Sequence, residues 1–439
     1  MRALVERRGA LLAACQPVTY GRIRRMVGTS IEVGGLDAAI GDCCLLHGAT
    51  SVVPAEVVAL GEGAVTCLPL GETRGLRAGA LAEATGGPLL APVGDGLLGR
   101  VLDGLGRPID GGGALVGVEQ ATIDHPAPHP LRRRAVSEQL ALGVRAIDAM
   151  LPCGKGQRLG IFAGSGVGKS SLLSMITRNT AADAVVVALV GERGREVAEL
   201  VERDLASALE RAVVVVATSD APALVRLRAA FLATRIAEWF RDRGRDVLLL
   251  MDSLTRCAMA QREVGLAAGE PPATRGYPPS VFGLLPRLLE RAGTDERGSI
   301  TGLYTVLVEG DDMNEPIADA SRSILDGHLQ LSRALAESGH YPAIDVLGSV
   351  SRVAPAITDP STRAAALAIR RLLAAYRDAR DLVEIGAYVP GTNPLVDAAI
   401  AAKPEIDRFC RQGLDEASTA AEAREGLARL AACYPEALP

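Results

Sequence analysis

The segment Ala163-Gly164-Ser165-Gly166-Val167-Gly168-Lys169-Ser170 decides the fold of this chain. It follows an apolar, strand-like run at residues 159–162, and Leu172, Leu173 and Ile176 then lie at helical spacing. A glycine-rich loop between a buried strand and a helix is the context of a phosphate-binding P-loop. Its glycines let backbone N–H groups point into one concavity, and the helix N-terminus adds partial positive charge. The segment therefore predicts a nucleotide-binding site.

Single residues of this loop have distinct expected roles. Lys169 can reach the β and γ phosphates, and the hydroxyl of Ser170 can ligate Mg²⁺. Ala163 stands where such loops usually begin with glycine, at the end of the strand. We expect ATP and Mg²⁺ as ligands, and we expect these residues to contact the nucleotide: Gly164, Ser165, Gly166, Val167, Gly168, Lys169, Ser170 and Ser171.

The chain around the P-loop alternates apolar runs with helical patterns. The strand-like runs are residues 159–162, 184–190, 213–217, 247–251 and 302–308. Between them, two groups lie at helical spacing: Val197, Leu200, Val201, Leu205 and Leu209, and Leu224, Leu227, Phe231 and Leu232. Apolar strands without alternation, separated by helices, predict a parallel sheet covered on both faces.

The two ends of the chain differ from this middle part. Short β segments separated by glycine turns run from about Gly21 to Leu81 and predict a small barrel. After about Pro360 the pattern is helical throughout. We expect three domains: a β-barrel and oligomerisation domain at 1–85, a P-loop ATPase domain at 86–359 and a helical domain at 360–439.

Composition excludes some classes of function. The net charge is −5 and aromatic residues make up 3%, which argues against a nucleic-acid partner. No apolar stretch approaches the ~18 residues of a membrane span, and the eight cysteines are scattered without C-x-x-C pairs. We therefore expect a cytoplasmic protein.

The first 25 residues are basic, with Glu6 as their acidic residue. They form either a solvated arm or a contact for an acidic partner or an anionic membrane surface. The basic residues are Arg2, Arg7, Arg8, Arg22, Arg24 and Arg25.

Two acidic residues follow predicted strands. Asp252 ends the apolar run 247–251, as a carboxylate that orients the metal would. Glu192 follows the run 184–190, at the sheet edge where ligands bind in parallel sheets. Glu192 is either the group that activates the attacking water or a surface partner of Arg193 or Arg195.

Three further segments resemble one superfamily, that of the rotary ATP synthase α and β subunits and the type III secretion ATPases. They are Gly191–Glu196, Met251–Arg256 and the stretch from Pro342 to Arg352. Residues 275–293 and 309–316 point to the secretion branch. Within that branch, Met313–Pro316 and Cys153–Arg158 are more similar to the injectisome ATPase than to the flagellar one.

The resemblance implies a RecA-like α/β core with a parallel sheet, flanked by an N-terminal β-barrel and a C-terminal helical domain. It implies that Glu192 is the general base and that Arg193 and Arg256 lie near the γ-phosphate. It implies that Tyr341 stacks on adenine and that Arg352 is an arginine finger that enters a neighbouring subunit; a structural ion pair is the alternative for Arg352. Asn393 stands where the family would have aspartate.

The resemblance also implies a function and partners. The chain is expected to be an ATP hydrolase that energises type III secretion as a homohexamer, releasing chaperones from export substrates and unfolding them. Its implied partners are stator and central stalk proteins, chaperone–effector complexes and an export gate, which would hold it peripherally at the inner membrane. A flagellar export ATPase, a non-catalytic synthase-type subunit and an RNA translocase are the alternatives. The second would carry glutamine in place of Glu192.

Overall fold

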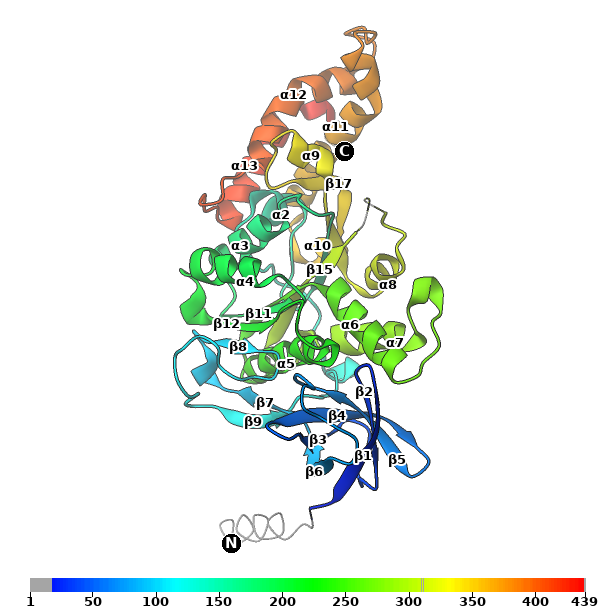
Figure 1. The fold of residues 1–439 in the computed structure, drawn as a ribbon. Helices are drawn as coiled ribbons and strands as arrows, with labels where there is room; N and C mark the ends of the chain where they lie inside the picture. The colour runs from blue at the N-terminus through cyan, green and yellow to red at the C-terminus, as the bar shows by residue number, and fades with distance from the viewer. Residues whose placement is uncertain (1–17, 309, 311, 438–439) are drawn as a thin grey trace.

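A computed structural model describes residues 18–308, 310 and 312–437. Its elements form a β-barrel, an α/β core and a helical C-terminal part, stacked in that order along the molecule (Figure 1). Of the basic N-terminal residues, Arg22, Arg24 and Arg25 lie exposed in the first strand. Arg2, Arg7 and Arg8 lie outside the described residues.

Six antiparallel strands close the barrel in the order β1-β2-β5-β4-β3-β6, which confirms the predicted barrel. Alternate residues such as Ile31, Val33, Cys44 and Leu46 are buried inside it, as the period of two requires. The strands are β1 (Tyr20–Val27), β2 (Ser30–Gly34), β3 (Asp42–His47), β4 (Val52–Gly61), β5 (Ala64–Pro69) and β6 (Leu81–Pro88). A two-stranded sheet of β7 (Leu90–Val93) and β9 (Glu119–Thr122) follows.

The core is a mostly parallel sheet in the order β17-β16-β10-β15-β13-β11-β12-β8, as the buried apolar runs predicted. β17 is antiparallel to β16, and a short strand β14 (Gly293–Thr294) pairs with β15. The strands are β8 (Val101–Asp103), β10 (Arg158–Ala163), β11 (Ala184–Val190), β12 (Ala212–Ala217), β13 (Asp246–Asp252), β15 (Ser299–Leu307), β16 (Gly327–Leu331) and β17 (Ile344–Ser351).

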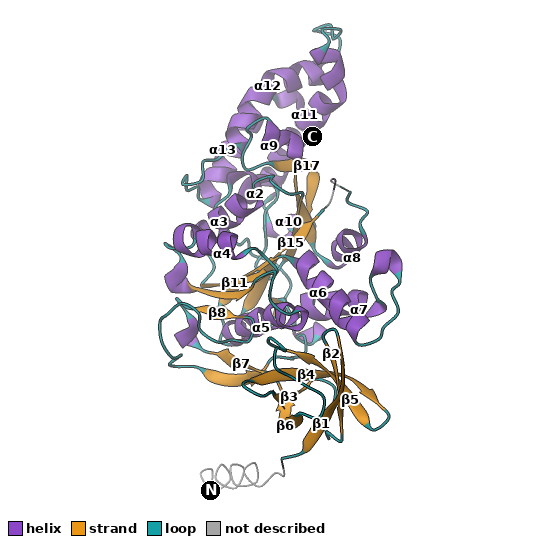
Figure 2. Cartoon of the chain, viewed as in Figure 1, coloured by secondary structure: helices purple, strands orange, loops and turns teal. Residues whose placement is uncertain are grey.

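Helices cover both faces of this sheet (Figure 2). Val185 and Val187 of β11 belong to a buried cluster that includes residues of α2 and α3, and Val186 and Ala188 to a cluster on the other face that includes residues of α5, α6 and α7. The C-terminal helices contact α2, and the first of them also contacts β17. The helices are α2 (Arg145–Met150), α3 (Lys169–Asn179), α4 (Gly194–Glu199), α5 (Ala223–Asp242), α6 (Leu254–Ala267), α7 (Pro279–Leu289), α8 (Pro316–Ile324), α9 (Arg333–Glu337), α10 (Ala354–Ile357), α11 (Pro360–Glu384), α12 (Pro394–Cys410) and α13 (Ala420–Ala432).

Two local features differ from the sequence patterns. The helical run from Val197 to Leu209 is α-helical only to Glu199, after which residues 200–204 form a π-helical turn. The wider turn buries both Leu200 and Leu205, which are five residues apart. β17 is the edge strand of the sheet and β16 is its neighbour. Both strands mix buried and partly exposed residues, so they gave no continuous apolar run.

The C-terminal part consists of α11, α12 and α13, which confirms the helical pattern after Pro360. Asn393 caps α12, with its side-chain oxygen accepting from the backbone N–H groups of Leu395 and Val396. Asparagine and aspartate are comparable caps, so this departure from the family pattern keeps the helix start. Among the residues that the structure describes, no helix is both long enough and apolar enough to cross a membrane.

Candidate functional site

The P-loop lies in a cavity of about 670 Å³ at the carboxyl ends of the central strands. β10 ends at Ala163, and α3 begins at Lys169 with its first turn at the cavity. Gly166 and Gly168 have φ angles of +79° and +89°, left-handed values that favour glycine. The helix N-terminus and the loop N–H groups thus provide a positive end for an anion, which is what a phosphate group needs.

The predicted nucleotide contacts divide into two groups. Seven of them line the cavity: Gly164, Ser165, Gly166, Gly168, Lys169, Ser170 and Ser171. The side chain of Val167 is instead buried in the core beneath the loop, so only its backbone is available to a ligand.

A lysine that lines this cavity lies close to two carboxylates. Nζ of Lys169 lies 2.5 Å from Oδ1 of Asp252 and 3.7 Å from Oε1 of Glu192. Glu192 and Asp252 come from the carboxyl ends of the adjacent strands β11 and β13, and Lys169 begins α3 after the P-loop that follows β10. β15 lies between β13 and β10, so all three residues lie at the same edge of the sheet. Ser170, at the first turn of α3, is exposed and lines the same cavity.

The environment of Glu192 suits a proton acceptor. Burial raises the pKa of its carboxyl above the usual range, the nearby Asp252 raises it further, and Lys169 and Arg256 oppose the rise. Oε1 of Glu192 is buried and accepts no hydrogen bond within the described residues, since Lys169 is too distant for one. A buried carboxylate oxygen without a donor is available to a water molecule in the cavity.

The two arginines expected near the γ-phosphate differ in their surroundings. Arg193 lines the cavity but is 78% exposed, and it pairs with Glu196 at 3.1 Å. Arg256 packs against Gly191, where an added Cβ would lie 3.0 Å from the Cβ of Arg256. Its Nε is buried, with no hydrogen-bond partner in the part of the chain that the structure describes. Arg256 is therefore better prepared than Arg193 to meet an anion in the cavity.

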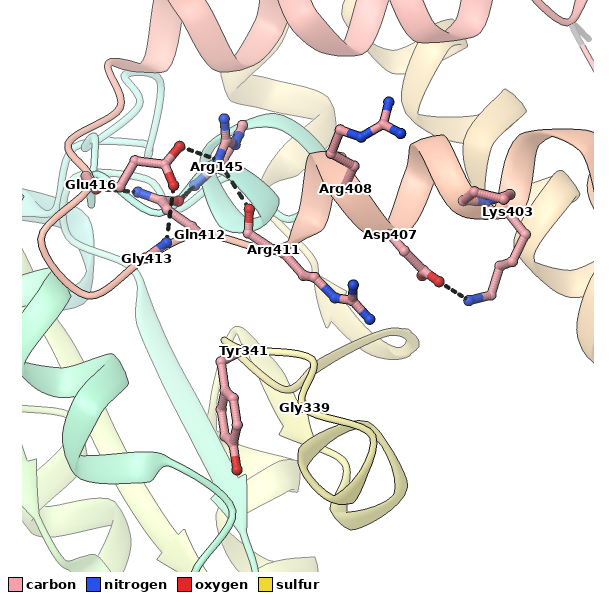
Figure 3. Close-up of a pocket in the computed structure, with 11 residues that line it drawn as sticks. Arg145, Gly339, Tyr341, Lys403, Asp407, Arg408, Arg411, Gln412, Gly413 and Glu416 are labelled. Atoms are coloured by element: carbon pink, nitrogen blue, oxygen red, sulfur yellow. Dashed lines mark hydrogen bonds and ion pairs between the residues drawn. The ribbon is translucent and has the colours of Figure 1, made fainter.

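Tyr341 lies against the other side of the P-loop. Its ring is so close to Gly168 that a Cβ there would lie 3.1 Å from Cε1 of the tyrosine. The ring is 45% exposed and faces a second cavity of about 840 Å³, bounded by the segment 411–416 (Figure 3). An exposed aromatic ring beside the phosphate loop fits a stacking surface for a nucleotide base.

Arg352 does not join this group of residues. It follows β17, whose last residue Ser351 pairs with Gly327, whereas its first residue Ile344 pairs with Leu331. Because β16 is parallel to β10, the end of β17 lies at the edge of the sheet opposite the P-loop. β16 crosses between the two edges from Gly327 to Leu331, which is four residue steps of ~3.3 Å, so the edges are about 13 Å apart along the strand. Arg352 is exposed there, and its guanidinium makes one long hydrogen bond of 3.5 Å, to the carbonyl of Arg322.

The structure adds two contacts of the site that no sequence motif revealed. The hydroxyl of Thr305, in the adjacent strand β15, donates to Oδ1 of Asp252 at 2.7 Å. A guanidinium nitrogen of Arg333 donates to the carbonyl of Ser165 in the P-loop at 3.3 Å. Both contacts depend on strand and loop neighbours far apart in sequence, so residue spacing carried no signal for either.

These residues fit a nucleotide with Mg²⁺. The phosphate cradle, the orphaned Nε of Arg256 and the exposed Tyr341 ring match the two ends of ATP. The exposed hydroxyl of Ser170 lines the cavity, and the carboxylate of Asp252 contacts the adjacent Lys169. Hydroxyl and carboxylate oxygens are the hard donors that Mg²⁺ prefers when phosphates complete its shell.

Three parts of the chain match described protein families. Residues 23–86 match the beta-barrel domain and residues 143–351 the nucleotide-binding domain of the ATP synthase alpha/beta family. Residues 358–429 match the T3SS EscN ATPase C-terminal domain.

Whole-chain relatives come from both protein-export systems. The chain is 51% identical to the flagellum-specific ATP synthase of Bacillus subtilis (strain 168) over 415 residues, 94% of this chain and 95% of the relative. It is 50% identical to the type 3 secretion system ATPase of Sinorhizobium fredii (strain NBRC 101917 / NGR234) over 416 residues, 94% and 92% of the two chains.

Its fold matches the assembled ATPase EscN from the enteropathogenic E. coli type III secretion system. The TM-score is 0.89 at 46% identity, and the match covers 94% of this chain and all of that one. The predicted fold and the predicted enzyme class are both confirmed. The chain therefore belongs to the family of the type III secretion system and flagellum-specific ATPases, and it is an ATP hydrolase of that kind.

Proposed function

We propose that this chain hydrolyses Mg-ATP in a ring of identical subunits, and that each active site is completed by Arg352 of a neighbouring copy. The observation that carries the proposal is the separation of Arg352 from the P-loop of its own chain. An arginine finger stabilises the charge that develops on the transferred phosphoryl group and is worth on the order of 10³–10⁵ in turnover. Arg352 lies at the opposite edge of the sheet, about 13 Å away along the strand and with β16 between β17 and β10. An arginine side chain does not reach across this separation, so a second copy would supply this charge.

Within one subunit, the side chains divide the work. Lys169 and the loop N–H groups hold the phosphates, and Arg256 adds positive charge beside them. Glu192 orients and deprotonates the attacking water, as its raised pKa and free Oε1 favour. Tyr341 supports the adenine base. Arg193, held by Glu196 at the cavity rim, has a lesser part, because its guanidinium is largely exposed to water.

Mg²⁺ would be held by Ser170, with Asp252 behind it, and would neutralise phosphate charge when bound. In this structure, Nζ of Lys169 forms an ion pair with Oδ1 of Asp252 at 2.5 Å. Nucleotide binding therefore requires Lys169 to exchange a carboxylate for a phosphate partner.

The ring and its partners are also proposals. EscN has been solved as an assembled ATPase and in complex with its central stalk EscO, and the latter structure matches this chain at 45% identity with a TM-score of 0.87. By this likeness we propose a homohexamer around a central stalk. We further propose that stator proteins, chaperone–effector complexes and an export gate bind it, and that it works in the cytoplasm at the inner membrane.

In this role the ATPase releases chaperones from export substrates and unfolds them. Residues 1–85 would act as the barrel and oligomerisation domain, 86–359 as the ATPase domain and 360–439 as the helical domain that meets partners. The strands that close the barrel and the helices after Pro360 support this division.

A flagellar export role is the second candidate, supported by flagellum-specific relatives of nearly equal identity. Met313–Pro316 and Cys153–Arg158 favour the injectisome. The two roles are distinguished by deleting the gene and asking whether the host loses motility or loses secretion of effectors.

A non-catalytic synthase-type subunit is disfavoured, because such a subunit would carry glutamine where this chain has Glu192 in the cavity.

The shared site is tested by mixing two inactive variants. Arg352→Ala and Lys169→Ala should each lack ATPase activity, and their mixture should recover part of it, because some interfaces then contain an intact P-loop and an intact arginine. Arg377→Ala, at an exposed arginine of α11, should stay active as the control. If mixed oligomers form by native mass measurement and no activity returns, the shared site is wrong.

A further inference from the structure

The cavity beside Tyr341 contains one polar side chain that is almost completely buried. Gln412 is 4% exposed and lies in the segment 411–416, which joins α12 to α13. Its neighbours in Figure 3 include Arg145, Glu416 and Tyr341, which come from three different parts of the chain. No role in ATP hydrolysis follows for Gln412 from the motifs of the sequence.

Both polar atoms of the Gln412 side chain are hydrogen-bonded. Its Oε1 accepts from the backbone N–H of Arg145 at 2.8 Å. Its Nε2 donates to the carbonyls of Gly143 at 2.9 Å and Glu416 at 2.8 Å. The side chain therefore ties the segment after α12 to the start of α2.

The backbone of the same residue holds the loop that carries Tyr341. The N–H of Gln412 donates to the carbonyl of Tyr341 at 3.0 Å. Tyr341 in turn lies against Gly168 of the P-loop. A continuous chain of contacts thus runs from α2 through Gln412 to the ring proposed to support adenine.

The connection is stiffened around Gln412. Arg145 reaches the carboxylate of Glu416 at 2.5 Å and the carbonyl of Arg411 at 3.0 Å, so the segment is held at several points (Figure 3). Buried amide networks that are fully satisfied fix one geometry, because any shift leaves a buried donor or acceptor unpaired.

We propose that Gln412 is a positioning residue for the nucleotide base: it holds the backbone of Tyr341 so that the ring stays at the P-loop. Gln412 thereby couples the C-terminal helices to base binding. The inference rests on the proposed role of Tyr341 as the base platform, the ring on which the nucleotide base stacks. It predicts that Gln412 affects ligands that carry a base and spares ligands that consist of phosphate alone.

The test compares ADP with inorganic pyrophosphate, both with Mg²⁺, by calorimetric titration of the full-length protein. Gln412→Glu keeps the volume and the acceptor but replaces the Nε2 donor with an oxygen that faces two carbonyls. We expect the Kd for ADP to rise about three- to tenfold, a fraction of the stacking contribution of a base. The Kd for pyrophosphate should stay within about twofold of the wild-type value.

Two further variants separate positioning from general stability. Gln139→Ala breaks another link between α2 and the C-terminal helices. The Nε2 of Gln139 donates to the carbonyl of Asp148, and its Oε1 accepts from the guanidinium of Arg424. No hydrogen bond joins the Gln139 side chain to Tyr341 in the described residues. Gln139→Ala should leave the ratio of the Kd for ADP to the Kd for pyrophosphate unchanged. Tyr341→Ala should raise that ratio about tenfold or more.

The outcomes distinguish the two proposals. If Tyr341→Ala leaves the ratio unchanged, Tyr341 is not the base platform, and the inference about Gln412 falls with it. If Tyr341→Ala raises the ratio but Gln412→Glu does not, or if Gln139→Ala raises it equally, Gln412 is not a positioning residue. Should Gln412→Glu fail to fold by circular dichroism, Gln412→Met, which keeps the shape without a charge, gives the deciding ratio.

Discussion

Replacing Glu192 with glutamine tests the chemistry of the cavity most directly. The substitution keeps the shape of the side chain but removes its ability to accept a proton. Glu192 lies 3.7 Å from Nζ of Lys169, and its Oε1 has no hydrogen-bond donor within the described residues. The phosphate cradle is therefore expected to remain, and nucleotide binding should stay within about twofold of wild type.

The expected loss is in turnover. A positioned general base contributes about 10²–10⁴ in rate, so kcat for Glu192→Gln should fall by that range while the Kd for ADP is unchanged. The pH dependence gives a second measure. Because burial and Asp252 raise the pKa of Glu192, wild-type kcat should decline as pH falls through a value above the ordinary range of glutamate.

Glu196 provides the matched control. It lines the same cavity, but its carboxylate is partly exposed and pairs with Arg193. Glu196→Gln should keep kcat within about threefold, as expected for an exposed ion pair. Steady-state ATPase assays from pH 5 to 9 with purified protein measure both variants. If Glu192→Gln retains kcat within about tenfold, or if Glu196→Gln loses as much, Glu192 is not the general base.

Three other substitutions test the surroundings of the site. Gly168→Ala should weaken ADP binding on the order of tenfold in calorimetry, because φ is +89° and the new methyl would press on Tyr341; a Kd within twofold would contradict this. Thr305→Val should lower the free energy of unfolding by about 1.5–3 kcal/mol in chemical denaturation, because the carboxylate of Asp252 loses a 2.7 Å hydrogen bond; equal stability would refute the contact. Burial raises the pKa of Asp148 to about 6 from an ordinary 3.8, so the folded state binds this proton more tightly and loses roughly 2 kcal/mol of stability as pH rises from 4 to 7. Asp148→Asn lacks that proton, so the difference in stability between wild type and variant should shrink over this pH range, and a constant difference would show that Asp148 does not titrate there.

Much of the architecture was encoded locally. The strand, loop and helix around Lys169 lie within about 20 consecutive residues, so the P-loop could be predicted from residue types and spacing alone. The apolar runs without alternation predicted buried parallel strands, because burial on both faces removes the period of two. Asp252 and Glu192 could be proposed because the ends of parallel strands meet at one edge of the sheet.

Other parts of the site were decided by which strands are neighbours, and residue spacing does not encode that. Thr305 reaches Asp252 only because β15 lies beside β13. Gln412 reaches Tyr341 only because the segment after α12 returns to the start of α2. Because β17 runs antiparallel to β16, Arg352 lies at the sheet edge opposite the P-loop of its own chain.

The sequence by itself thus determined that the chain binds a nucleotide and what its core looks like, since patterns of burial are written residue by residue. Only the tertiary structure decided that Arg352 lies apart from the P-loop of its own chain and that the segment after α12 is hydrogen-bonded to the loop of Tyr341. Those properties depend on strand order and on long-range hydrogen bonds, such as the one between Gly143 and Gln412, which are 269 positions apart.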